Sequence, residues 1–506
     1  MYFKARQKEE EYPMRASGIL MHISSLPSDY GIGTLGKAAY DFIDFLEEAK
    51  QSYWQILPVC PTSYGDSPYQ SFSTHAGNPY FIDMDILAEE GLLKKSDYSG
   101  INWGEDEEKT DYSAIYNNRY KVLKKAYNNF KNSDKTEFNK FLAENENWIS
   151  NYALFMSIKD AQDGKCWLEW EEGLKHRNPH DLWLFKEAHY DEVEFWEFLQ
   201  FEFFRQWGKL KEYANEKKIK IIGDIPIYVA LDSVDVWVYT DLFELDEKLN
   251  PKTVAGCPPD AFSETGQLWG NPIYDWDRHK ETGYGWWIDR LKGSTKLYDV
   301  VRIDHFRGFD EYYAIPYGDK TAVNGKWKQG PGIEFFSFLE EKLGKLNIIA
   351  EDLGFLTPSV IKMLEDSGFP GMKVLEFAFD SGAHNTYLPH NHTKNSVVYA
   401  GTHDNEPIKA WMKNVSKSTL QFCKQYIGFT GRDTEKFVWA YISAVMGSVS
   451  DTAIIQMQDY LCLGEESRMN TPSIGAGNWQ WRSRKSDFTK SLAEKIAEVT
   501  VIYGRI

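Results

Sequence analysis

Short runs of apolar and β-branched residues recur along the chain, and each ends in a polar or glycine-rich turn. Segments with helical spacing of apolar residues lie between several of these runs. We count about eight runs: Gly18–Ser24, Tyr53–Val59, Ile219–Val229, Val300–Phe306, Ile348–Leu353, Lys373–Phe379, Ser396–Thr402 and Ala453–Met457. Eight parallel strands close a (β/α)8 barrel, so the pattern predicts an α/β fold of the TIM-barrel type. A doubly wound open sheet has the same alternation and stays open as the alternative at this point.

The clearest helical patterns are Lys37–Lys50, Glu334–Leu346 and Pro358–Ser367. The spacing of the runs is uneven, which predicts one barrel domain over residues 1–506 that carries two insertions. We expect residues 60–215 to form a mostly helical subdomain on the functional rim of the barrel. We expect residues 231–299 to carry a long loop, Gly256–Pro272, because glycine and proline are dense there. A loop of this length is typical of a lid or a binding segment.

Composition excludes several classes of function. The chain has 42% hydrophobic residues, which is too many for a disordered protein, and a formal net charge of -18. A negative surface repels phosphate backbones and anionic lipid, so we expect neither nucleic acid nor a membrane surface as a partner. Aromatic residues make up 15% of the chain. Most of these rings belong in the core, but some offer the flat apolar faces that bind sugars.

The five cysteines are scattered and include no C-x-x-C pair. This favours reduced thiols, a cytoplasmic location and no zinc site. The residues Met1 to Arg15 are charged and lack an apolar segment, so we expect no secretory signal. We also expect no membrane span and no cofactor, because no 18-residue apolar stretch and no phosphate-binding loop is present.

Three of the strand-like runs end in acidic residues, which are Asp304, Glu351 or Asp352, and Asp404. The carboxyl ends of barrel strands form the active-site face, so these side chains are expected around one pocket. Arg302 lies two residues before Asp304 and shares its side of the strand, which predicts that Asp304 stays ionised. Glu351 and Asp352 point to opposite sides, and we choose Glu351 for the pocket although the spacing alone does not decide.

Two adjacent carboxylates are what a retaining glycosidase needs, and a third can stabilise positive charge on the sugar ring. The competing interpretation is that each acid caps the helix that follows its strand. We favour catalysis for the set, because Arg302 and His403 accompany the three acids.

These motifs resemble the 4-α-glucanotransferases of glycoside hydrolase family 77, also called amylomaltases or disproportionating enzymes. The resemblance covers most of the chain. It is carried by the segments 18–27, 64–72, 223–228, 256–271, 302–308, 350–354 and 401–405.

The resemblance implies that Asp304 is the nucleophile, Glu351 the general acid/base and Asp404 the stabiliser of the transition state. Arg302 and His403 would support the reacting sugar. The same resemblance implies sugar contacts for Tyr69, Asp224, Gln267, Trp269, Asn271 and, in an outer glucan site, Tyr64. Simple packing is the alternative for the aromatic rings, and helix capping is the alternative for Asp224. The family has no catalytic metal.

The sequence therefore predicts a 4-α-glucanotransferase that acts on α-1,4-glucans and maltooligosaccharides by double displacement. Two alternatives are kept: an α-glucan hydrolase of the α-amylase type with the same three carboxylates, and a non-catalytic glucan-binding protein. The oligomeric state is not predicted.

Overall fold

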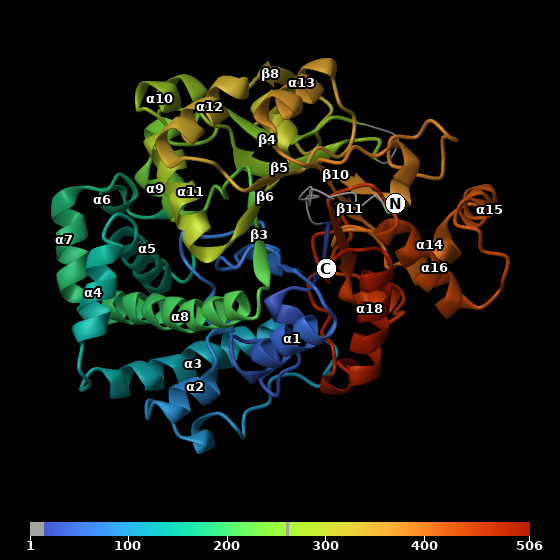
Figure 1. Cartoon of the computed structure of the whole chain (residues 1–506). Coiled ribbons are helices and arrows are strands. Elements are labelled where there is room, and N and C mark those ends of the chain that lie inside the picture. Colours follow the sequence, from blue (N-terminus) through green and yellow to red (C-terminus); the bar gives the residue numbers. More distant parts are fainter. Residues whose placement is uncertain (1–14, 260–262) are drawn as a thin grey trace, which may run out of the picture.

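A closed barrel of eight parallel strands forms the centre of the computed structural model, which describes residues 15–259 and 263–506 apart from the side chain of Tyr64 (Figure 1). Around the barrel the strands follow the order β1-β12-β11-β10-β9-β6-β3-β2. Their bounds are β1 (Ala16–Leu20), β2 (Tyr53–Gln55), β3 (Lys220–Pro226), β6 (Val300–Asp304), β9 (Ile348–Ala350), β10 (Gly371–Val374), β11 (Ser396–Tyr399) and β12 (Thr452–Gln456). Each of the eight predicted runs overlaps one of these strands. The prediction of a (β/α)8 barrel is confirmed, and the open sheet is excluded.

The first and last strands pair with each other and thereby close the barrel. In that pair Ala16 lies opposite Thr452, and on its other edge β1 places Gly18 opposite Tyr53 of β2. A Cβ atom on Gly18 would lie 2.6 Å from the Cβ atom of Tyr53, so only glycine permits this approach. The strands are buried on both faces, which explains their nearly continuous apolar sequence.

Helices cover the outside of the barrel. They include α1 (Lys37–Glu48), α11 (Gly285–Leu297), α12 (Gly332–Leu343), α13 (Pro358–Ser367), α16 (Thr434–Met446) and α18 (Lys490–Ile502). The limits of α13 follow from local chemistry. Thr357 caps its first turn by accepting from the N–H of Val360, proline occupies the first helical position, and Gly368 ends the helix in the left-handed conformation with φ of 69°.

The connection from β2 to β3 is mostly helical. It contains α2 (Met84–Glu89), α3 (Tyr112–Phe130), α4 (Thr136–Glu144), α5 (Ile149–Ala161), α6 (Glu172–Lys175), α7 (Pro179–Ala188) and α8 (Tyr190–Glu216). These helices lie together on one side of the barrel, at the lower left of Figure 1. The 27-residue helix α8 packs along α5 and leads back into the barrel at β3.

The expectation of a loop over the whole of Gly256–Pro272 is wrong at the two ends of this segment. Residues 256–257 and 267–272 belong to a small antiparallel sheet with the strand order β5-β4-β7-β8. Its strands are β4 (Thr253–Cys257), β5 (Gln267–Pro272), β7 (Glu311–Pro316) and β8 (Lys326–Gln329). Only glycine fits at position 256 of β4, because a Cβ atom there would lie 2.1 Å from the carbonyl oxygen of Gln267 on the facing strand. Residues 260–262 of the expected loop lie outside the described residues.

The remaining strands of this sheet, β7 and β8, follow β6 in a part of the chain where no strand was expected. The small sheet lies above the barrel strands in Figure 1. Among the described residues, no helix is both long enough and apolar enough to cross a bilayer.

Candidate active site

The carboxyl ends of three neighbouring barrel strands carry the predicted polar side chains. Register pairs Asp224 of β3 with Arg302 of β6, and Pro226 with Asp304. The backbone N–H of Glu351 donates to the carbonyl oxygen of Ile303 at 3.1 Å. Glu351, the residue after β9, therefore lies opposite Asp304 of the neighbouring strand β6. Because neighbouring strands lie about 4.8 Å apart, both carboxyls start from adjacent points of one rim.

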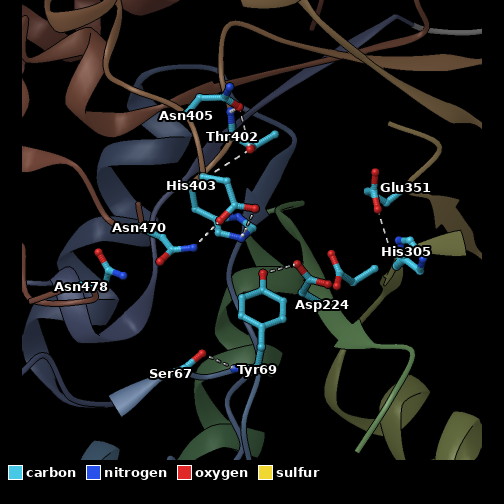
Figure 2. A network of polar contacts seen from close by, with 12 residues as sticks. Ser67, Tyr69, Asp224, His305, Glu351, Thr402, His403, Asn405, Asn470 and Asn478 are labelled. Carbon is cyan, nitrogen blue, oxygen red and sulfur yellow. Dashed lines mark hydrogen bonds and ion pairs between the residues drawn. The ribbon is translucent and has the colours of Figure 1, made fainter. Parts of the chain in front are cut away.

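Arg302 connects two of the acids at the base of this site. Its side chain is 3% exposed, and it lies 2.6 Å from Asp224 Oδ2 and 3.1 Å from Asp304 Oδ1. Tyr69 also donates its hydroxyl to Asp224 Oδ2, at 2.8 Å (Figure 2). Asp224 is thus the shared acceptor of Tyr69 and Arg302, and its side chain is fully buried.

The charge state expected for Asp304 is not the one that the structure supports. Burial raises the pKa of Asp304 to about 8, and Asp224 and Glu351 add to the rise, while Arg302 opposes it. Arg302 does not overcome burial because its guanidinium lies closer to Asp224 and divides its charge between the two acids. The prediction that Arg302 keeps Asp304 ionised at neutral pH is therefore wrong as it stands, because burial and the neighbouring acids oppose the effect of Arg302.

Glu351 is oriented by the backbone. Its Oε2 atom accepts from the N–H of His305 and its Oε1 atom from the N–H of Leu353, both at 2.7 Å. His305 reaches this position in the left-handed region, with φ of 53°. Figure 2 shows the Glu351 carboxyl directed at His305. Burial raises the pKa of Glu351, while Arg302 and the two backbone donors lower it.

Asp352 faces a different part of the barrel. Its Oδ1 atom accepts from the backbone N–H of Met372 at 2.6 Å, and the residue is 2% exposed. Of the two neighbouring acids, Glu351 is the one whose carboxyl interacts with Asp304. This answers the question that strand alternation leaves open.

Asp404 belongs to the turn Thr402–Asn405, which follows β11. Its Oδ1 atom accepts from Asn470 Nδ2 at 2.6 Å, and its Oδ2 atom lies 3.4 Å from His403 Nε2. Arg468 donates to the carbonyl oxygen of Asp404 at 3.0 Å. The Asp404 side chain is 42% exposed, so the turn presents it to the open side of the site.

Aromatic rings line the site beside this turn. The rings of Tyr69 and His403 stack with centroids 5.2 Å apart and planes 15° apart, and Trp479 lies 5.8 Å from Tyr69. Because Tyr69 also bonds Asp224, this stack joins the Asp404 turn to the Arg302 side of the barrel (Figure 2).

The hairpin of β4 and β5 contributes the other predicted residues. Trp269 donates to Gln267 Oε1 at 3.1 Å and meets the ring of His305 edge-on at 4.9 Å. Asn271 is buried and donates to the carbonyl oxygen of Val229 at 2.8 Å. Asn271 therefore ties the hairpin to the barrel. The side chain of Tyr64, expected in an outer site, lies outside the described part of the structure.

Sequence reasoning missed Arg468, Asn470 and Trp479. They lie in the segment after β12, which has neither strand nor helix spacing to draw attention to it. Nothing in the sequence of this segment points to Asp404, because Arg468 and Asn470 reach Asp404 only in the closed barrel. In the described chain no group of three or more His, Cys, Asp or Glu side chains is arranged to hold a metal ion.

A closed parallel barrel with acidic side chains gathered at its strand ends defines a barrel enzyme with an acid–base site. Comparison with known families is more specific. A family model described as 4-alpha-glucanotransferase matches residues 21–487. The chain belongs to this family, glycoside hydrolase family 77, and is an enzyme of that class.

Relatives that match over nearly the whole chain bear the same description. The chain is 52% identical over 487 residues to a 4-alpha-glucanotransferase of Clostridium butyricum, with 96% of this chain and 100% of the relative covered. It is 49% identical over 495 residues to a 4-alpha-glucanotransferase of Streptococcus pneumoniae, with 97% and 98% covered.

Among solved structures, an amylomaltase of Streptococcus agalactiae in complex with acarbose has a TM-score of 0.95 and 45% identity, with 97% of this chain and 99% of that chain covered. An amylomaltase of Corynebacterium glutamicum is 16% identical with a TM-score of 0.74, which supports the fold alone. Its match covers 97% of this chain and 74% of that one.

Proposed function

We propose that this chain is a 4-α-glucanotransferase, which cuts an α-1,4-glucan and joins one piece to the end of another sugar. Family membership and the full-length relatives of that name support the activity. The observation that carries the mechanism is the level position of Asp304 and Glu351 on neighbouring strands. Retaining glycosidases need two carboxyl groups about 5–5.5 Å apart, and this arrangement favours such a separation.

In the proposed first step, a carboxylate oxygen of Asp304 attacks the anomeric carbon of the donor. The bond from that carbon to the glycosidic oxygen breaks, and Glu351 gives its proton to the departing oxygen. A glycosyl–aspartate ester results, and the rest of the donor leaves. In the second step Glu351 takes the proton of an acceptor hydroxyl, whose oxygen displaces Asp304 and forms a new α-1,4 bond. Two inversions retain the configuration.

The reaction needs one proton on the pair of Asp304 and Glu351. Burial raises the pKa of both groups, so one proton stays with the pair at neutral pH. The first step needs the form in which Asp304 carries the charge and Glu351 carries the proton, and Arg302 beside Asp304 favours that form against the burial that raises the pKa of Asp304.

The other site residues bind and orient the sugar in this proposal. Asp404 is half-exposed and carries negative charge toward the ring that becomes positive in the transition state. His403 and Asp224 are suited to hydrogen bonds with sugar hydroxyls. Tyr69 offers a ring held by stacking on His403. Gln267 and Trp269 on the hairpin cover the site, and Asn271 holds that hairpin in place.

Transfer exceeds hydrolysis when a sugar is held beside the ester while water is excluded. Trp269 is the side chain best suited to both tasks, because its ring lies against His305, whose N–H bonds Glu351. We propose that α-1,4-glucans and maltooligosaccharides are both donors and acceptors.

The test is incubation of the pure protein with maltotriose, followed by separation of the products. A transferase yields a ladder of shorter and longer glucans, whereas an α-amylase-type hydrolase yields only shorter ones. A non-catalytic glucan-binding protein yields neither. Asp304→Asn should abolish the ladder while maltooligosaccharide binding is retained, and a covalent sugar trapped on any residue other than Asp304 would reassign the nucleophile.

The arrangement of one barrel domain over residues 1–506, with insertions at 60–215 and 231–299, is part of the proposal. So is a cytoplasmic location, which the odd number and scattered spacing of the five cysteines support. Limited proteolysis, which cuts first at the edges of separately folded units, tests the domain assignment. Cell fractionation tests the location.

A further inference from the structure

A fourth carboxyl group lies at the barrel mouth, and the proposed mechanism does not use it. Glu376 follows β10, so it lies between the strand that leads to Glu351 and the strand that leads to Asp404. Its Oε1 atom is shielded from solvent and has no hydrogen-bond partner among the described residues. An enclosed carboxyl oxygen of this kind needs a physical reason to be there.

Glu376 packs against the root of the turn that carries Asp404. A Cβ atom on Gly401 would lie 2.8 Å from Glu376 Oε1 and 3.0 Å from the Cβ atom of Asn405. The backbone N–H of Glu376 donates to the carbonyl oxygen of Ala400 at 3.3 Å. Glu376 and Asn405 therefore meet where residue 401 has no side chain, directly before the turn begins.

Asn405 folds that turn. Its Oδ1 atom accepts from the N–H and the hydroxyl of Thr402, both at 2.9 Å, as Figure 2 shows. The Thr402 hydroxyl in turn accepts from the N–H of Asp404 at 3.3 Å. The amide oxygen of Asn405 is thus used inside the turn, which leaves its amide nitrogen as the polar group on the side of Glu376.

We propose that Glu376 is a positioning residue, which holds the Thr402–Asn405 turn through Asn405 and thereby sets the direction of Asp404. Glu376 touches no substrate in this inference. The inference rests on the proposed function, in which Asp404 stabilises the transition state.

The surroundings disfavour a negative charge on Glu376. Burial raises its pKa well above the usual range, Asp459 and Glu406 add to the rise, and Asn405 and Arg468 oppose it. Tyr441 of α16 also faces this group. A neutral carboxyl accepts from the Asn405 amide and keeps an O–H donor, which is the hydrogen-bonding pattern of a glutamine.

Glutamine should therefore be able to take the place of Glu376 with little loss of activity, whereas an apolar residue should not. Glu376→Gln should retain most of the parent kcat on maltotriose. Glu376→Leu should lower kcat by about tenfold or more while KM changes little, because a small misplacement of a catalytic group is costly. Thermal melts of both variants report whether the fold survives. Parent-like kcat in Glu376→Leu would overturn the inference.

An exchange of donor and acceptor gives the sharper test, and it does not depend on the leucine variant. Asn405→Asp keeps the oxygen that accepts from Thr402 but replaces the amide donor by a second acid. The two acids then share a proton at low pH and repel each other once it is lost. The activity of Asn405→Asp relative to the parent should therefore fall as pH rises from 5 to 8.

Adding Glu376→Gln to Asn405→Asp supplies a permanent donor to the new acid, so the double variant should recover activity and lose this pH dependence. A double variant no more active than Asn405→Asp would overturn the inference. Asn395→Asp is the matched control, because it makes the same change just before the opposite end of β11, where the side chain is exposed and donates to the Gly368 carbonyl at 3.0 Å. A parent enzyme without transfer activity would instead contradict the proposed function.

Discussion

The guanidinium of Arg302 lies 2.6 Å from Asp224, and both side chains are almost completely buried. This pair is tighter than the contact between Arg302 and Asp304, which measures 3.1 Å. The charge of the proposed nucleophile therefore depends on a neighbouring acid that does not itself react.

Asp224→Asn should make Asp304 more acidic. The substitution keeps an oxygen that can accept from Arg302 and Tyr69, but it removes a negative charge that raises the pKa of Asp304. Because Asp304 must be ionised to attack, the acidic limb of the profile of kcat/KM against pH should move to lower pH. Asp241→Asn, a change at an exposed ion pair, is the control. A limb that stays in place or moves up would contradict the charge relationship described above.

The hydroxyl group and the ring of Tyr69 should contribute separately to kcat/KM. Tyr69→Phe removes the 2.8 Å bond to Asp224 and keeps the stack on His403. A hydrogen bond to a charged group contributes about 1.5–3 kcal/mol, so kcat/KM should fall by roughly tenfold or more. Tyr69→Leu should cost more, because the platform is lost as well. Tyr30→Phe removes a similar bond to Asp85, at 2.7 Å, and should leave kcat/KM unchanged. Equal kcat/KM in both Tyr69 variants would mean that the ring is not a sugar platform.

Trp269→Ala should raise the ratio of hydrolysis to transfer. Its ring covers His305 beside the Glu351 carboxyl, so its loss admits water and weakens the hold on an acceptor. The measurement compares glucose release with the formation of longer glucans from maltotriose. Trp327→Ala, on β8 of the same small sheet, is the control because its ring contacts Tyr313 and Arg307. An unchanged product ratio in Trp269→Ala would show that the hairpin does not exclude water.

Asp459→Asn should stabilise the protein increasingly as pH rises. Burial raises the pKa of Asp459 to about 7, from an ordinary value near 3.8. The folded state therefore holds a proton that the unfolded chain releases, and stability is lost as pH rises from about 4 toward 7. Each pKa unit corresponds to about 1.4 kcal/mol, so the effect amounts to a few kcal/mol.

Asparagine keeps the oxygen that accepts from the N–H of Ile408 at 2.7 Å and has no proton to lose. The Tm of Asp459→Asn should match or fall below that of the parent at pH 4–5 and exceed it at pH 8. Tm curves that run parallel across this range would rule out Asp459 as the titrating group.

The barrel was predictable because its strands are defined locally. Runs such as Ile219–Val229 and Val300–Phe306 are buried on both faces, so their apolar sequence is continuous and their polar ends are distinct. The small sheet was not predictable in this way. Its strands β4 and β5 contain glycine and proline, and the reason for Gly256 is the close approach of the facing strand, which the sequence does not reveal.

The same difference separates the site residues that could be predicted from the sequence from those that could not. Asp304 and Glu351 stand out in the sequence because Asp304 ends β6 and Glu351 follows β9, and Arg302 lies two residues before Asp304. Asp224, inside β3, was named from the family resemblance. Arg468, Asn470 and Glu376 were missed, because their relevance comes only from contacts with the turn of Asp404. The charge on Asp304 was misjudged for a related reason. The spacing of Arg302 and Asp304 is visible in one strand, whereas the competition from Asp224 depends on the neighbouring strand.

The pairing of β1 with β12 also has a consequence for how this protein is made. A ribosome delivers the chain from its amino end, so the first strand waits without one of its neighbours until β12, which ends at Gln456, has emerged. Arg468 and Asn470, which hold Asp404, emerge later still. A nascent chain thus has its proposed nucleophile long before it has a closed barrel or a fixed third carboxylate, and glucan chemistry should begin only after Arg468 and Asn470 have joined the fold.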